Sequence, residues 1–161
     1  MPVEIERKFL VNKNDLRDII KRMRLKGTEQ LQGYLCINEQ RTIRIRVAGE
    51  EGFVTIKGKV ESQSRKEFEY EIPMQDALIL LHASCLRPLI RKTRYRIHYD
   101  ENNFWEVDEF HDENEGLIIA EMELVYPTQF LIKPYWVGEE VTDDERYYNA
   151  RLVSYPYKSW K

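Results

Sequence analysis

The sequence predicts an α+β fold: an eight-stranded antiparallel β-barrel with a charged lumen, flanked by about three helices. Three observations carry this prediction. Segments rich in β-branched and aromatic residues recur along the chain, apolar and polar side chains alternate within them, and single strands carry charges of one sign on their polar face. We interpret the 161 residues as one domain, 1–161, long enough to bury a sizeable core.

Alternating segments define eight expected strands. They span residues 3–11, 31–37, 42–47, 53–59, 66–72, 92–99, 104–110 and 117–126. Short polar connections, such as AGEEG at 48–52 and DENN at 100–103, are typical of hairpin turns. The sheet is therefore expected to be mostly antiparallel.

Three expected helices interrupt the strands. Residues 14–24 carry apolar side chains at helical spacing. Residues 76–86 begin at Asp76, a favourable N-cap residue. The last helix is expected to begin near Thr142, because Thr142 and Glu145 match the spacing of a capping box.

Composition excludes several classes of protein. With 25 Lys and Arg against 28 Asp and Glu, the net charge of −3 gives no overall basic footprint for nucleic acid. No segment approaches the roughly 20 apolar residues of a membrane span, and the N-terminus lacks a signal-peptide pattern. Cys36 and Cys85 lack metal-ligand spacing and are interpreted as reduced core residues. We therefore expect a cytoplasmic protein with no nucleic-acid or membrane partner.

The opening segment VEIERKFLV places Glu4, Glu6 and Lys8 on one face of a strand, because side chains alternate along a strand. Taken alone, this face fits an edge strand whose charges lie in solvent. The alternation recurs, however, with charges of a single sign on several later strands. Bases alone occupy positions 44/46 and 92/94, and acids alone occupy positions 106/108 and 121/123.

A solvated sheet face usually mixes both signs, which allows weak cross-strand pairs. Strands whose charges all have one sign argue against a solvated sheet face. The simplest alternative geometry closes the strands into a barrel, with apolar faces outward beneath the helices and charges inward.

The two sets of lumen charges are complementary to one ligand. The acids are Glu4, Glu6, Glu67, Glu69, Glu106, Asp108, Glu121 and Glu123, and the bases are Lys8, Arg44, Arg46, Lys57, Lys92 and Arg94. Carboxylates are hard oxygen ligands that suit Mg²⁺ or Mn²⁺. Arginine and lysine suit phosphate oxygens. Together they indicate a metal-bound chain of phosphates, as in phosphoryl transfer.

Seven short motifs, in order, carry a family resemblance. They are EIERK at 4–8, RIR at 44–46, TIKG at 55–58, SRKEFE at 64–69, KTRY at 92–95, WEVDEF at 105–110 and AEMEL at 120–124. Through them the chain resembles the triphosphate tunnel metalloenzymes, also called the CYTH superfamily, and in particular its short single-domain bacterial inorganic triphosphatases. The resemblance runs from residue 3 to about 152, and GEEVTDDERYYNARL resembles the ending of short bacterial members. The tail VSYPYKSWK, 153–161, lies outside it, and its role is left open.

The resemblance implies an eight-stranded tunnel and metal-dependent hydrolysis of a triphosphate, with inorganic tripolyphosphate split into pyrophosphate and phosphate as the favoured reaction. Cyclisation of ATP to cyclic AMP, and hydrolysis of thiamine or nucleoside triphosphates, are alternatives in the same tunnel. A non-catalytic polyphosphate- or nucleotide-binding module is an alternative of another class. The preferred triphosphate and the oligomeric state stay open.

Residues and resemblance together assign the candidate roles. The catalytic candidates are Lys8, Glu4 and Glu6; the substrate-binding candidates are Lys8, Arg44, Arg46, Lys57, Lys92 and Arg94; and the candidate ligands for one or two Mg²⁺ or Mn²⁺ ions are Glu4, Glu6, Glu69, Asp108, Glu121 and Glu123. Glu67 and Glu106 are secondary candidates, because an acid there also suits a neighbouring arginine. Beside two carboxylates, Lys8 is not expected to have a depressed pKa, so we expect it to contact the reacting phosphate or a metal-bound water. The general base is not assigned.

Overall fold

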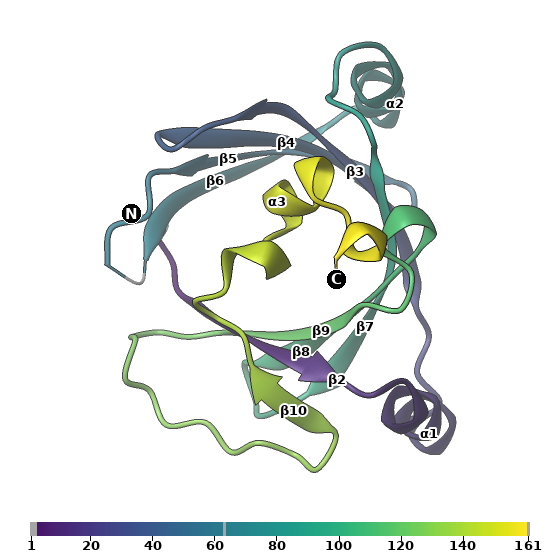
Figure 1. Ribbon diagram of the computed structural model, residues 1–161, viewed down its shortest axis with the longest axis vertical. Coiled ribbons are helices and arrows are strands. Elements are labelled where there is room, and N and C mark those ends of the chain that lie inside the picture. The colour runs from purple at the N-terminus through teal and green to yellow at the C-terminus, as the bar shows by residue number, and fades with distance from the viewer. Residues whose placement is uncertain (1–2, 63, 161) are drawn as a thin grey trace.

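The computed structural model describes residues 3–62 and 64–160, and its strands form one sheet that curls into a tunnel (Figure 1). The strands are β1 (Val3–Glu4), β2 (Glu6–Val11), β3 (Thr28–Ile37), β4 (Arg41–Ala48), β5 (Glu51–Gly58), β6 (Arg65–Ile72), β7 (Ile90–His98), β8 (Phe104–Phe110), β9 (Ile118–Glu123) and β10 (Val137–Glu140). Their order is β1-β6-β5-β4-β3-β7-β8-β9-β2-β10, with antiparallel neighbours. The predicted antiparallel tunnel is confirmed. Of the predicted domain 1–161, residues 1–2, 63 and 161 lie outside the described residues.

The first predicted strand, 3–11, is two strands that close the tunnel. β1 pairs with β6, with Glu4 opposite Arg65, whereas β2 pairs with β9, with Glu6 opposite Glu123. Ile5 lies between them, and its carbonyl accepts a hydrogen bond from Leu124 N at 2.7 Å. The ring therefore closes through the covalent chain at Ile5 and not through an uninterrupted ladder.

β10 was not predicted. It is four residues long and pairs with β2, with Val137 opposite Val11 and Glu140 opposite Phe9. Its sequence VGEE has no apolar–polar alternation, so the pattern that identifies the other strands is missing.

Two helices cover the outside of the ring, as predicted (Figure 1). α1 (Lys13–Met23) begins after Asn12, whose side chain accepts a hydrogen bond from Asn14 N, and it buries Leu16 and Ile19 in a core cluster with Trp105. α2 (Met74–Ala83) packs on the outer face of β4 through the cluster that holds Ala77, Leu81, Ile45 and Val47. The core lies between the sheet and these helices.

The predicted start of the second helix is wrong. α2 begins at Met74, and its N-cap position is Pro73, which has no side chain able to cap. Asp76 instead lies in the first turn, where its negative charge favours the positive end of the helix dipole.

The predicted third helix near Thr142 is also wrong. Thr142 Oγ1 accepts a hydrogen bond from Lys8 N at 3.0 Å and donates one to Glu140 at 2.6 Å, so it ties this segment to β2 instead of capping a helix. A 3₁₀ helix, Glu145–Tyr147, follows with Asp144 as its cap, and α3 spans Asn149–Ser154. Two other 3₁₀ helices span Asp112–Asn114 and Tyr157–Ser159.

α3 lies inside the ring when the tunnel is viewed end-on, and not outside it as predicted (Figure 1). The reason is an apolar end of the lumen. Its residues share the lumen face with the charged ones through strand register, and they form one cluster with Leu152 and Val153 of α3: Tyr34, Ile90, Phe110 and Ile119. The expectation that all apolar faces point outward is therefore wrong at this end, where α3 fills the lumen.

The tail continues this packing, because the Trp160 ring makes edge contacts with the rings of Tyr147 and Tyr157. Within residues 3–62 and 64–160, none of the helices combines the length and the apolar character needed to cross a membrane.

We predict that α3 is held mainly by its apolar anchor. Leu152 is fully buried, so Leu152→Ala should lower the free energy of unfolding by about 2–5 kcal/mol through lost contacts and a cavity. Its exposed neighbour gives the control: Arg151→Ala should change stability by no more than about 0.5 kcal/mol. Urea denaturation of the three proteins measures both values, and equal stability of the two variants would contradict this account of α3.

Candidate active site

The structure brings all the predicted acids and bases onto the lumen face. Cross-strand register places Lys8 opposite Glu121, Arg94 opposite Asp108, and Lys57 opposite Glu67. The remaining candidates follow by alternation along the same strands: Glu4, Glu6, Arg44, Arg46, Glu69, Lys92, Glu106 and Glu123. Several are buried despite their charge, which makes ion pairing obligatory.

The most buried group is a three-residue ion cluster on β7 and β8. Asp108, with a side chain 1% exposed, accepts from Lys92 Nζ at 2.8 Å and from Arg94 Nε and Nη2 at 2.7 and 2.9 Å. Burial opposes its charge, but the two cations hold the pKa of Asp108 down to about 2. Complete burial and the charge of Arg94 lower the pKa of Lys92 to about 8, against the attraction of Asp108.

Lys8 has the opposite balance. Its Nζ lies 2.8 Å from Glu121 and 3.1 Å from Glu6. Burial alone would lower its pKa, but Glu121, Glu6 and Glu4 together raise it above its ordinary value. Lys8 is therefore a permanent cation, suited to binding an anion and not to accepting a proton.

Basic side chains crowd together on β4. Arg46 Nη2 lies 3.0 Å from Glu69 Oε1, and Arg44 Nη2 lies 3.5 Å from the same oxygen. Thr55 Oγ1 donates to Glu69 at 2.9 Å and accepts from Arg44 at 3.1 Å. Burial and the charges of Arg44 and Arg94 lower the pKa of Arg46 to about 10, so this part of the lumen has an excess of positive charge.

Carboxylates crowd together at β1, β2 and β9. Burial, together with the charges of Glu4, Glu6 and Glu106, raises the pKa of Glu123. Glu4 is the best compensated of these acids, because Lys57 lies 2.9 Å away and Arg65 lies 3.4 Å away. The region around Glu123 therefore has an excess of negative charge, which a divalent cation would relieve.

Within the described residues, no three His, Cys, Asp or Glu side chains converge closely enough to hold a metal. The physical reason is that ion pairs occupy the carboxylates: Glu121 is bonded to Lys8, Glu4 to Lys57, and Asp108 to Lys92 and Arg94. The donor chemistry around Glu123 fits a cation such as Mg²⁺ or Mn²⁺, but binding requires some side chains to exchange partners.

Sequence analysis missed several neutral polar residues of the lumen. Gln30 and Gln32 lie on the lumen face of β3 opposite Lys92 and Arg46, and both are buried. Thr55 and Asn149 bond directly to candidate residues. Alternation would have found Thr55 and the glutamines, but neutral side chains add nothing to a charge pattern, and the predicted strand began one residue after Gln30.

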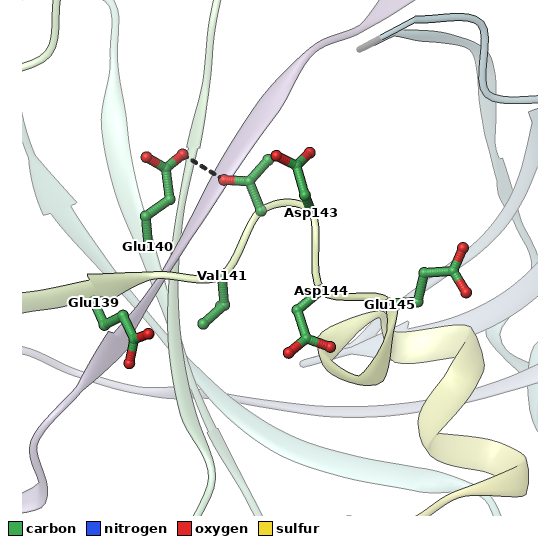
Figure 2. Close-up of a pocket in the computed structure, with 7 residues that line it drawn as sticks. Glu139, Glu140, Val141, Asp143, Asp144 and Glu145 are labelled. Carbon is green, nitrogen blue, oxygen red and sulfur yellow. Dashed lines mark hydrogen bonds between the residues drawn. The ribbon is translucent and has the colours of Figure 1, made fainter.

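A second group of acids lines a depression formed by residues 139–145 (Figure 2). Figure 2 shows their carboxylates pointing in different directions and not converging. Glu140 is paired with Arg7 at 2.6 Å, and Asp144 is paired with Arg146 at 2.6 Å. The carboxylates of this depression therefore do not converge on one point, and two of them are held in ion pairs.

Comparison with known proteins identifies the family. The CYTH domain family matches residues 2–150. The chain is 43% identical over 161 residues to the inorganic triphosphatase of Acetivibrio thermocellus, covering 100% of this chain and 99% of that protein. It is 34% identical over 153 residues to the inorganic triphosphatase of Nitrosomonas europaea, covering 93% and 96%.

The fold agrees with these similarities. The crystal structure of an inorganic triphosphatase matches with a TM-score of 0.61 at 32% identity, covering 93% of this chain and 97% of that one. The chain therefore belongs to the CYTH family, and the predicted family is confirmed.

We predict that the lumen ion pairs contribute unequally to stability. Asp108→Asn leaves the buried cations Lys92 and Arg94 without a counter-charge and should lower the free energy of unfolding by about 3–5 kcal/mol. Arg46→Gln removes a cation that repels Arg44 and Arg94, so it should lower stability by less than about 1 kcal/mol, or raise it. Urea denaturation in EDTA makes the comparison. Equal losses of stability in both variants would mean that Arg46 stabilises the fold and is not a repelled, uncompensated cation.

Proposed function

We propose that this protein is a metal-dependent triphosphatase that hydrolyses inorganic tripolyphosphate to pyrophosphate and phosphate. The observation that carries the proposal is the separation of charge within one lumen. Burial and the neighbouring cations Arg44 and Arg94 lower the pKa of Arg46, while burial and the neighbouring carboxylates raise the pKa of Glu123. A metal-bound triphosphate supplies an anion to the first region and a cation to the second. The names of relatives at 43% and 34% identity support inorganic tripolyphosphate as the substrate.

The bases bind and neutralise the phosphate chain. Arg44 and Arg46 present guanidinium donors from β4, and Lys92 and Arg94 present donors from β7. Lys8 and Lys57 complete the set. Because the side chains of these cations are little exposed to solvent, they stabilise the charge that builds on the phosphoryl oxygens during an in-line displacement.

Glu123 would hold the metal together with Glu4, Glu6 and Glu106, the carboxylates whose charges act on it. Glu121 joins them when Lys8 transfers from its carboxylate to a substrate oxygen. Asp108 and Glu69 are the remaining candidates, and each must release an arginine before it can bind a metal. When bound, Mg²⁺ or Mn²⁺ polarises the phosphoryl oxygens and lowers the pKa of the attacking water.

Lys8 acts as a cation in this scheme. Its raised pKa keeps it protonated, so it directs a phosphate oxygen or the attacking water by donating hydrogen bonds. Release of Lys8 from Glu121 would link substrate binding to metal binding, because it would free a carboxylate while Lys8 bonds a phosphate.

The reaction is tested with a substrate panel. Protein treated with EDTA should not hydrolyse tripolyphosphate, and added Mg²⁺ or Mn²⁺ should restore hydrolysis, with pyrophosphate and phosphate released in equal amounts on ion chromatography. The same assay with ATP, GTP and thiamine triphosphate ranks the substrates. Cyclic AMP and pyrophosphate formed from ATP would establish cyclisation, and full turnover in EDTA would overturn the role of the metal.

The metal site is tested with a matched pair of variants. Glu123→Gln preserves size but removes charge from the acidic region, so activity should fall by at least the roughly 10- to 100-fold that loss of a supporting metal contact costs. Glu139→Gln makes the same change in the depression formed by residues 139–145 and should retain activity. Raising the concentration of Mn²⁺ should partly rescue Glu123→Gln. A loss that is the same for both variants would contradict a metal site at Glu123.

A further inference from the structure

Asn149 joins the end of the chain to the most buried cation of the tunnel. It is the first residue of α3, and its Oδ1 accepts hydrogen bonds from Lys92 Nζ at 3.1 Å and from Gln32 Nε2 at 3.0 Å. The same Lys92 ammonium bonds Asp108 at 2.8 Å. A residue remote in sequence therefore completes the surroundings of a proposed phosphate ligand.

The orientation of this amide follows from the chemistry of its neighbours. An ammonium group only donates, so the atom of Asn149 that faces Lys92 is its oxygen. Gln32 must then donate through Nε2 to reach the same oxygen. The two hydrogens of Asn149 Nδ2 make no hydrogen bond to any residue in 3–62 or 64–160. This leaves a free pair of donors beside Lys92, on a side chain that is only partly buried.

Contacts other than these two hydrogen bonds hold Asn149 in place. Leu152 and Val153 anchor α3 among the apolar residues of the lumen end. Tyr148 OH donates to Thr142 O at 3.4 Å, and the Tyr148 ring lies 5.8 Å from Lys8 Nζ. The amide is thus positioned before any ligand arrives, which reduces the entropy lost on binding.

The order of lumen residues along β7 and β9 indicates which phosphate of the substrate lies beside Asn149. Along β7 the lumen face runs from Ile90, which packs in the cluster with α3, to Lys92 and then to Arg94. Along β9 it runs from Ile119 in the same cluster to Glu121 and then to Glu123. The phosphate beside Lys92 is therefore the one next to α3, and the chain can extend only away from that helix.

We propose that Asn149 is a substrate-binding residue whose Nδ2 donates to the terminal phosphate held by Lys92. The inference rests on the proposed function and narrows its substrates to chains with a free terminal phosphate. Inorganic tripolyphosphate has such a group, whereas a triphosphate esterified at both ends does not. The α3 segment is thereby part of the binding site as well as a filler of the lumen.

Two substitutions separate donation to substrate from simple positioning of Lys92. Asn149→Asp keeps an oxygen acceptor for Lys92 and Gln32 but replaces the free donor with a second oxygen, which repels phosphate. Asn149→Ala removes both functions. Ser154→Ala is the control, because Ser154 lies exposed on the same helix and, among residues 3–62 and 64–160, its hydroxyl bonds only to Arg151 O.

KM and kcat for tripolyphosphate are measured with Mg²⁺, and the thermal midpoint of each metal-free protein is recorded. We expect Asn149→Asp and Asn149→Ala to raise KM by at least about tenfold, with Asp the worse, because each loses a hydrogen bond to a charged group. Ser154→Ala should keep the wild-type KM. A wild-type KM in Asn149→Asp, with only Asn149→Ala impaired, would overturn donation to the substrate.

A binding titration keeps this test separate from the test of the reaction. Calorimetry with tripolyphosphate in EDTA should give the same order of affinities: wild type and Ser154→Ala tightest, then Asn149→Ala, then Asn149→Asp. A wild type that binds but does not hydrolyse would refute the proposed function while leaving the order of affinities as the test of Asn149. A dinucleoside triphosphate esterified at both ends should compete at least about tenfold less well than tripolyphosphate, and equal competition would overturn the assignment of a terminal phosphate.

Discussion

The structure depends on keeping charges of like sign close together in a lumen where several of them are buried. Buried charges are stable only when paired, and the tunnel pairs them unequally. Asp108 has two cations in direct contact, whereas Arg46 shares one carboxylate oxygen with Arg44, and Glu123 lies among other acids. A protein optimised for stability alone would not place Arg44 beside Arg46 or Glu6 opposite Glu123. The uncompensated charges favour binding of a ligand that carries both a cation and an anion, such as a metal-bound triphosphate.

This constraint also explains why the barrel has its core outside. Charges fill the middle of the lumen, so apolar side chains must be buried elsewhere, and α1 and α2 cover them on the outer faces of the sheet. The apolar end of the lumen faces α3, which buries Leu152 and Val153 there. The α3 segment therefore has two roles: it covers apolar surface, and it places Asn149 beside Lys92 in the charged region.

Local patterns predicted most of the fold and which charged side chains share the inner face of the strands. Alternation with period 2 identifies strands such as β4 and β8, and charge sign along them gives the inward face, because both properties belong to one strand. What the sequence did not reveal depends on contacts between distant segments. Thr142 has the spacing of a capping box but bonds Lys8 N instead, and Asn149 becomes a lumen residue only because apolar side chains further along α3 fit the tunnel end. β10 has no pattern of its own and exists because β2 offers it an edge.

The division of the first strand at Ile5 has a consequence for the order in which the molecule assembles. β1 and β2 pair with strands that lie far apart in the chain: Glu4 of β1 lies opposite Arg65 of β6, and Glu6 of β2 lies opposite Glu123 of β9. Contacts between residues so far apart close large loops, and their entropic cost is met only after the intervening hairpins have formed. The β1–β2 segment is therefore among the last parts of the described sheet to reach its final neighbours. β1 has a partner as soon as β6 has formed, but β2 lacks its partner on this side until β9 has formed, so the tunnel closes only after the intervening hairpins are in place.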